Sequence, residues 1–119
     1  MKVLVCGGRD YKDKIRVFVE LNALRPDVVV HGACPTGADR FAREYCEDTK
    51  QGITEDAHPA KWHKHGPAAG PIRNREMLAT KPDVVLAFPG GRGTADMVKQ
   101  AELAGLNVIR VEDHESRTT

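Results

Sequence analysis

The sequence contains few cysteines and few aromatic residues. Its three cysteines, Cys6, Cys34 and Cys46, are odd in number and form no Cys-x-x-Cys pair. A disulfide framework and a zinc site are therefore not expected, and a reducing, cytoplasmic setting is the default expectation. With one Trp, two Tyr and three Phe, the core must consist mainly of Val, Leu, Ile and Ala. His63 and His65 have a metal-like spacing but no third ligand nearby, so no metal and no cofactor is expected.

Long hydrophobic runs and an excess of one charge are missing as well. No apolar run approaches the ~20 residues that a membrane span needs, and the first aliphatic run ends too soon, at Gly7, to be a signal peptide. We expect no membrane association. The 18 Lys and Arg residues nearly balance the 17 Asp and Glu residues, whereas domains that coat nucleic acid are usually strongly basic. Nucleic acid is therefore not the expected partner, and the length of 119 residues predicts a single domain, residues 1–119.

Short aliphatic runs alternate along the chain with longer segments of helical period. The aliphatic runs predict strands over Val3–Cys6, Val28–His31, Ile53–His58 (a weak one), Val84–Phe88 and Asn107–Val111. The segments with apolar residues mostly three or four apart predict helices over Lys12–Leu24, Gly37–Thr49, Ile72–Thr80 and Thr94–Ala104. The stretch Pro59–Pro71, rich in proline and glycine, is expected to be a long functional loop. The polar tail Glu112–Thr119 is expected to fray.

All the predicted strands except Ile53–His58 are continuously apolar rather than alternating, which is typical of parallel strands covered on both faces. Strand–helix alternation through the whole chain is typical of an α/β protein. We therefore expect a three-layer αβα Rossmann-like sandwich around a five-stranded parallel sheet. The expected strand order is 3-2-1-4-5, in which the first and fourth strands flank the topological switch point where ligands bind.

Glycine-rich turns follow three of the predicted strands. The first strand leads into Cys6-Gly7-Gly8-Arg9-Asp10, the second into His31-Gly32 and then Gly37-Ala38-Asp39-Arg40, and the fourth into Pro89-Gly90-Gly91-Arg92-Gly93-Thr94. Turns after parallel strands lie at the same edge of the sheet. Glycine lets backbone N–H groups approach a ligand, helix N-termini favour negative charge, and arginine is suited to phosphate. The three turns together predict a phosphate-binding crevice.

Two familiar nucleotide-binding motifs are absent. No Gly-x-Gly-x-x-Gly follows the first strand, and the second strand ends in His31-Gly32 rather than in the acidic residue that holds a ribose, which disfavours a dehydrogenase. The run from Gly90 to Thr94 lacks the Gly-Lys-Ser/Thr ending of a Walker A sequence. The protein is therefore not expected to be a P-loop ATPase.

Pro89-Gly90-Gly91-Arg92-Gly93-Thr94 resembles the Pro-Gly-Gly-x-Gly-Thr signature of the LOG proteins, phosphoribohydrolases that cleave nucleoside 5′-monophosphates. The rest of the chain resembles the small YspA-type branch of the same SLOG Rossmann-like superfamily, in the segments Cys6–Tyr11, His31-Gly32 with Gly37–Asp39, Pro59–Trp62 and Ala69–Met77. The resemblance implies the fold expected above and a nucleotide or nucleotide-derived signal as ligand. Some members of the superfamily act in conflict between bacteria and phages. LOG-type proteins commonly pair through helices, so the resemblance also implies a homodimer.

One position departs from the LOG pattern. The LOG enzymes read Pro-Gly-Gly-x-Gly-Thr-x-x-Glu, with a glutamate taken to be catalytic, and Met97 stands at that position here. A thioether can neither accept a proton nor stabilise an oxocarbenium ion, so the LOG mechanism does not carry over intact. Whether the protein is an enzyme stays open, with Asp96, Glu76 and Asp39 as the carboxylates that would replace the glutamate.

Arg73-Asn74-Arg75 opens a short predicted helix. Positive charge at a helix N-terminus opposes the helix dipole, so these residues favour an anionic ligand over a merely solvated first turn. One of the two arginines corresponds to the arginine that the LOG enzymes place upstream. Asp39 is expected either to hydrogen-bond ribose hydroxyls or to favour the start of its own helix. Thr94 is expected to cap the last helix, to offer its hydroxyl to a phosphate, or both.

The expected function is binding of a nucleotide or nucleotide-derived phosphate ligand, as a sensor or a sequestering protein. Two alternatives stay open. The first is a hydrolase of the N-glycosidic bond of nucleoside monophosphates, and the second is a single-stranded nucleic-acid-binding module, because a DNA-processing protein shares the superfamily's fold. The predicted ligand-binding residues are Gly7, Gly8, Arg9, Gly32, Gly37, Asp39, Arg73, Asn74, Arg75, Pro89, Gly90, Gly91, Gly93 and Thr94.

Overall fold

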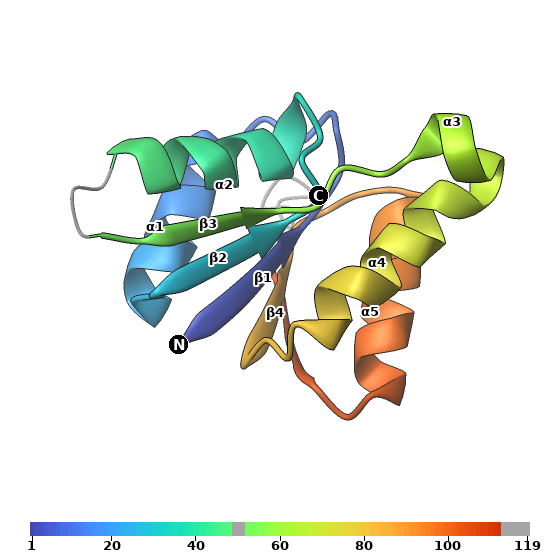
Figure 1. Cartoon of the computed structure of the whole chain (residues 1–119). Coiled ribbons are helices and arrows are strands. Elements are labelled where there is room, and N and C mark those ends of the chain that lie inside the picture. Colours follow the sequence, from blue (N-terminus) through green and yellow to red (C-terminus); the bar gives the residue numbers. More distant parts are fainter. Residues whose placement is uncertain (49–51, 113–119) are drawn as a thin grey trace, which may run out of the picture.

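Parallel strands form the centre of the molecule in the computed structural model, which describes residues 1–48 and 52–112. They are β1 (Lys2–Cys6), β2 (Val28–His31), β3 (Thr54–Ala57), β4 (Val84–Ala87) and β5 (Asn107–Arg110). Their order in the sheet is β3-β2-β1-β4-β5, and every neighbouring pair is parallel (Figure 1). The predicted five-stranded parallel sheet and its strand order are confirmed.

The central strand, β1, is buried on both faces. Its side chains alternate between the two faces of the sheet, so Val3 and Val5 pack on one side while Leu4 and Cys6 pack on the other. Both faces exclude water, which is why the aliphatic run is continuous in the sequence. At the sheet edge, β3 carries mostly exposed residues, and this accounts for the weak apolar signal of that strand.

Two long helices cover each face of the sheet. On one face lie α1 (Lys14–Leu24) and α2 (Gly37–Asp48), and on the other lie α4 (Ala69–Ala79) and α5 (Arg92–Leu103) (Figure 1). Leu21 of α1 belongs to the buried cluster that contains Val5, and Met97 of α5 belongs to the cluster that contains Leu4. The expected three layers are therefore present. Within the described ranges, no helix has the length and apolar character needed to cross a membrane.

The segment expected to be a long loop, Pro59–Pro71, is partly helical, so that prediction is wrong. It contains α3 (Trp62–His65), the short 3₁₀ helix η1 (Gly66–Ala68) and the first turn of α4. Pro67 and Pro71 both stand in the first turns of helices, where the backbone N–H has no partner within the helix and proline costs little. Two of the prolines that favoured a loop in the sequence therefore stand in the first turns of helices.

Several element ends also differ from the predictions. α1 begins at Lys14 rather than Lys12, because the side chain of Asp13 caps it by accepting a hydrogen bond from the Arg16 N–H at 3.0 Å. α5 begins at Arg92, with Gly91 rather than Thr94 at the N-cap position. The predicted end of the second helix at Thr49 and the predicted frayed residues 113–119 lie outside the described residues.

Substitution of two leucines by alanine should lower the free energy of unfolding by very different amounts, because one leucine belongs to a buried cluster and the other is exposed. Leu4 is 0% exposed in the centre of the sheet, whereas Leu103 at the end of α5 is 78% exposed. We expect Leu4→Ala to lower the free energy of unfolding by about 2–5 kcal/mol, because it removes buried methyl groups and leaves a cavity. Leu103→Ala should change it by less than about 0.5 kcal/mol. Urea denaturation of both variants tests this, and similar losses would contradict the buried position of Leu4.

Candidate functional site

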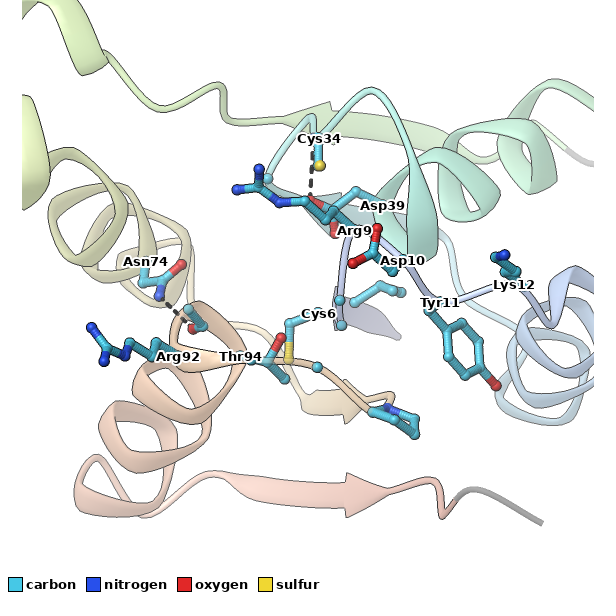
Figure 2. Close-up of a pocket in the computed structure, with 18 of the residues that line it drawn as sticks. Cys6, Arg9, Asp10, Tyr11, Lys12, Cys34, Asp39, Asn74, Arg92 and Thr94 are labelled. Carbon is cyan, nitrogen blue, oxygen red and sulfur yellow. Dashed lines mark hydrogen bonds between the residues drawn. The ribbon is translucent and has the colours of Figure 1, made fainter. Parts of the chain in front are cut away.

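A cleft lies beyond the carboxyl ends of β1, β2 and β4. It encloses about 1260 Å³ and is bordered by all three glycine turns, which contribute Gly8, Gly32 and Gly91 among others. Figure 2 shows that residues from both helical layers face it, with Asn74 on one side and Tyr11 on the other. The three glycine turns therefore share one edge of the sheet, as predicted.

Most of the predicted ligand-binding residues line this cleft. They are Gly7, Gly8, Arg9, Gly32, Asp39, Arg73, Asn74, Pro89, Gly90, Gly91, Gly93 and Thr94. Gly37 lies beneath the cleft lining, and Arg75 is exposed on α4 and does not border the cleft. Of the three carboxylates considered as replacements for a catalytic glutamate, Asp39 borders the cleft, whereas Asp96 and Glu76 do not.

The backbone of Gly8 ties the three turns together. Its N–H donates to the Pro89 carbonyl oxygen at 2.9 Å, which joins the turn after β1 to the turn after β4. Its carbonyl oxygen accepts from the Ala38 N–H at 3.3 Å, which joins it to the start of α2. Gly37 packs so closely on this carbonyl that a Cβ would overlap the oxygen, and its φ of +75° also requires glycine. The close approach of the turns thus depends on glycine at Gly37.

The first turn of α5 presents open backbone to the cleft. The first N–H groups of a helix have no partner within the helix, and together they carry partial positive charge. A Cβ at Gly91 or Gly93 would meet no heavy atom within 4 Å, so both glycines border open space. At Gly90, in contrast, a Cβ would overlap the Thr94 hydroxyl and lie 2.6 Å from the Gly8 nitrogen. Gly90 serves the packing of the turns, whereas Gly91 and Gly93 leave room for a ligand.

A hydrogen-bonded chain from α4 forms one wall of the cleft. Arg73 donates through Nη1 to the Gly32 carbonyl oxygen at 2.7 Å and through Nε to Asn74 Oδ1 at 3.1 Å. Asn74, which is 2% exposed, donates through Nδ2 to the Gly93 carbonyl oxygen at 3.2 Å and to Asp96 Oδ2 at 2.9 Å. The side chain of Arg73 is therefore held between the turn after β2 and the first turn of α5.

The position of Arg73 and Arg75 within α4 corrects the argument from the helix dipole. Because α4 begins at Ala69, Arg73 and Arg75 lie beyond its first turn, and neither opposes the dipole at the N-terminus as expected. The charge of Arg73 is placed in the cleft by its hydrogen bonds to Gly32 and Asn74. The reason to consider it as a ligand contact is therefore tertiary, not local.

Asp39 is a buried carboxylate at the back of the cleft. Its Oδ2 accepts a hydrogen bond from the Cys34 N–H at 3.2 Å. Burial raises the pKa of Asp39, and the Cys34 N–H together with the nearby charge of Arg73 pulls it partly back down. Asp39 thus faces Arg73 and helps to hold the turn after β2, and its carboxylate borders the space that a ligand would occupy.

Comparison with known proteins identifies the family. The model of the YspA, cpYpsA-related SLOG family matches residues 1–65, which include the turns after β1 and β2. The chain belongs to this SLOG family. The chain is also 38% identical over 125 residues to the Gene 61 protein of Mycobacterium phage D29, covering 94% of this chain and 97% of that protein. No solved structure matches the chain.

In this SLOG protein, the position that corresponds to the LOG glutamate lies in the core. Met97 is completely buried and packs with Leu4 and Met77 between α5 and the sheet. It does not border the cleft. The neighbouring Asp96 is engaged through Oδ2, which accepts from Asn74 and from Gln100 Nε2 at 2.7 Å. Asp96 therefore orients Asn74.

Further residues border the cleft besides the predicted ligand-binding ones. Arg92, Asp10 and Cys34 belong to the glycine turns that the sequence singled out, whereas Val5, Cys6, Tyr11, Lys12, Asp13, Arg16, Met77 and Glu112 were missed. Tyr11, Lys12, Asp13 and Arg16 follow the turn after β1, and their place after a glycine turn is the signal that could have marked them. Cys6, at the end of the first strand, is buried and also borders the cleft. Burial raises the pKa of the Cys6 thiol to about 12, so Cys6 is not a thiolate nucleophile at neutral pH.

The exposed tryptophan and the histidines lie outside the cleft. Trp62 is 56% exposed on α3, and the edge of its ring covers Gly70 of α4. His63 and His65 belong to the same short helix, and within residues 1–48 and 52–112 no group of three His, Cys, Asp or Glu side chains is placed to hold a metal ion.

The different surroundings of Gly90 and Gly93 predict opposite effects of one substitution. Gly90→Ala should lower the free energy of unfolding by about 1–3 kcal/mol, because its Cβ overlaps Thr94 and the Gly8 backbone. Gly93→Ala should leave it unchanged or raise it slightly, because its Cβ meets no atom and alanine favours helix. Thermal unfolding of the two variants measures the difference. Equal stability would argue against the close contact between the turns after β1 and β4.

Asp96 gives a second pair of variants. Asp96→Leu leaves one Nδ2 hydrogen of the buried Asn74 without its acceptor, which should cost about 1–3 kcal/mol of stability. Asp96→Asn keeps an oxygen that can accept from both Asn74 and Gln100, so its stability should stay close to that of the unchanged protein. Chemical denaturation of both variants tests the role of Asp96 as a positioning residue. Equal losses in the two variants would show that its charge, not its hydrogen bonds, is what matters.

Proposed function

We propose that this SLOG protein binds a nucleotide or nucleotide-derived phosphate ligand in the cleft, with the phosphate at the first turn of α5. The observation that carries the proposal is the composition of the cleft wall formed by α4 and residues 89–94, here called the α5-side wall. It combines open backbone at Gly91 and Gly93 with the cations Arg73 and Arg92, and no Asp or Glu from these segments borders the cleft.

The α5-side wall has the physical properties that a phosphate requires. Residues at the start of a helix of 12 residues border the cleft, and their backbone N–H groups carry the positive end of the helix dipole. Arg73 uses Nε and one Nη1 hydrogen to hold its position, which leaves the other N–H groups of its guanidinium for a phosphate oxygen. The side chain is already ordered, so little entropy is lost when a ligand binds.

The size of the cleft supports a ligand larger than a phosphate ion. The volume of about 1260 Å³ is above the range of roughly 300–1,000 Å³ that is typical of small-molecule sites. A nucleotide fits within that space and still leaves part of the cleft to solvent. Membership of a SLOG family supports the same class of ligand, because a nucleotide or nucleotide-derived signal is the ligand expected for this superfamily.

Binding without turnover agrees best with the carboxylates of the site. Met97 lies in the core, Asp96 is held by Asn74 and Gln100, and Glu76 does not border the cleft. Asp39 does border it, and its Oδ2 holds the turn after β2 by accepting from the Cys34 N–H. We therefore propose a sensing or sequestering role, and we expect negligible release of free base when the protein is incubated with purine nucleoside monophosphates.

Substitution of two arginines of the same helix tests the proposed phosphate contact. Arg73→Ala should weaken binding of a nucleoside 5′-monophosphate by about 10- to 150-fold, because a charge-assisted hydrogen bond is worth roughly 1.5–3 kcal/mol. Arg75→Ala is the matched control and should leave the affinity unchanged, because Arg75 does not border the cleft. Calorimetric titration with a panel of nucleoside monophosphates and the corresponding nucleosides measures both effects.

Arg73→Ala also removes two hydrogen bonds within the protein, so its melting temperature is expected to fall and titrations should be made well below it. Arg92→Ala gives an independent test, because Arg92 is exposed at the start of α5 and borders the same wall. Equal affinity of the unchanged protein for phosphorylated and unphosphorylated nucleosides would rule out the proposed phosphate site.

A further inference from the structure

The cleft has a second wall with a different chemical character. It is formed by the turn after β1, the start of α1 and Glu112, and is here called the α1-side wall. Figure 2 shows Tyr11 and Lys12 of this wall across the cleft from Asn74 and Arg92, with Cys6 and Thr94 between them. The charged residues with which it borders the cleft are Arg9, Asp10, Lys12, Asp13, Arg16 and Glu112.

The two walls differ in the net charge of the side chains with which they border the cleft. On the α1-side wall three cationic and three acidic side chains border the cleft, whereas the α5-side wall contributes two arginines and no acid. The α1-side wall thus has no net charge with which to attract a second phosphate. A ligand that lies across the cleft, with its phosphate on the α5-side wall, therefore meets the α1-side wall with an uncharged part.

Tyr11 gives the α1-side wall a fixed aromatic surface. Its ring packs on Phe88, with 5.2 Å between the ring centroids and 40° between the ring planes. Phe88 is buried, and the Tyr11 N–H donates to the Gly8 carbonyl oxygen at 3.2 Å. Tyr11 is half-buried and borders the cleft. The ring is therefore held in place from the protein side while part of the side chain is accessible from the cleft.

We propose that the α1-side wall is a nucleobase subsite and that Tyr11 is the residue on which the base stacks, so that it distinguishes ligands with a base from ligands without one. The inference rests on the proposed function, because it requires a nucleotide whose phosphate lies at the start of α5. A base brings an uncharged aromatic face, which stacks on tyrosine regardless of base identity. It also brings N–H groups, which can donate hydrogen bonds to the exposed carboxylate of Asp10. Both features match a wall that is aromatic and without net charge.

The test compares ligands that share a phosphate and differ in the base. Adenosine 5′-monophosphate and guanosine 5′-monophosphate carry a base, and ribose 5-phosphate does not. Calorimetric titration of the full chain should show that the nucleotides bind at least fivefold more tightly than ribose 5-phosphate. Tyr11→Leu should weaken nucleotide binding by roughly 5- to 150-fold, the range measured for removal of a base-stacking ring, and should leave ribose 5-phosphate binding unchanged. Tyr11→Phe, which keeps the ring, should retain the affinity for both classes of ligand.

Three results would overturn an assignment, and they are distinguishable. Equal affinity of the unchanged protein for the nucleotides and ribose 5-phosphate rules out a base subsite, and this measurement needs no variant to fold. Equal weakening of both ligand classes by Tyr11→Leu shows that Tyr11 supports the cleft as a whole and does not select a base. If neither the nucleotides nor ribose 5-phosphate binds the unchanged protein, the proposed phosphate site itself fails.

Discussion

The candidate site depends on the close contact between three turns that are far apart in the sequence. Gly8 joins them, since its N–H bonds to Pro89 and its carbonyl oxygen accepts from Ala38. Side chains at Gly37 or Gly90 would separate these backbones, because a Cβ at either position overlaps the neighbouring turn. Glycine at these positions serves packing between turns, whereas Gly91 and Gly93 leave open backbone at the start of α5. Residues 89–94 therefore contain one glycine that the packing of the turns requires, Gly90, and two that border open space, Gly91 and Gly93.

The second constraint is the hydrogen-bonded connection between the two helices of one layer. Asn74 is buried and uses both Nδ2 hydrogens and its Oδ1, which join it to Gly93, Asp96 and Arg73. A buried amide with a missing partner is costly, so the arrangement is cooperative. Its consequence is that the guanidinium of Arg73 is held against the turn after β2, on the rim of the cleft. Stability and the proposed phosphate contact thus depend on the same side chains.

The proposed function assigns recognition of a ligand to the cleft. Its buried thiol, Cys6, has a raised pKa and stays protonated at neutral pH. The position where LOG enzymes carry a glutamate is Met97, which fills the core between α5 and the sheet. What the cleft offers is a cationic wall with open backbone, a wall of balanced charge with an aromatic ring, and a volume suited to a nucleotide. These are properties that position a ligand.

The sequence alone determined the fold class, the strand order and the common edge of the three glycine turns. Continuous apolar runs, helical periodicity and the positions of the glycines are local signals, and the rules of sheet topology are enough to derive the architecture from them. It did not determine that Pro59–Pro71 is partly helical, since a proline is compatible with both a loop and the first turn of a helix. Nor could it show which of Arg73 and Arg75 borders the cleft. It also could not show that Asp96 accepts a hydrogen bond from Asn74, or that the ring of Tyr11 packs on Phe88. Those assignments depend on which side chains the folded layers bring within hydrogen-bonding or stacking distance, and such contacts between distant residues exist only in the tertiary structure.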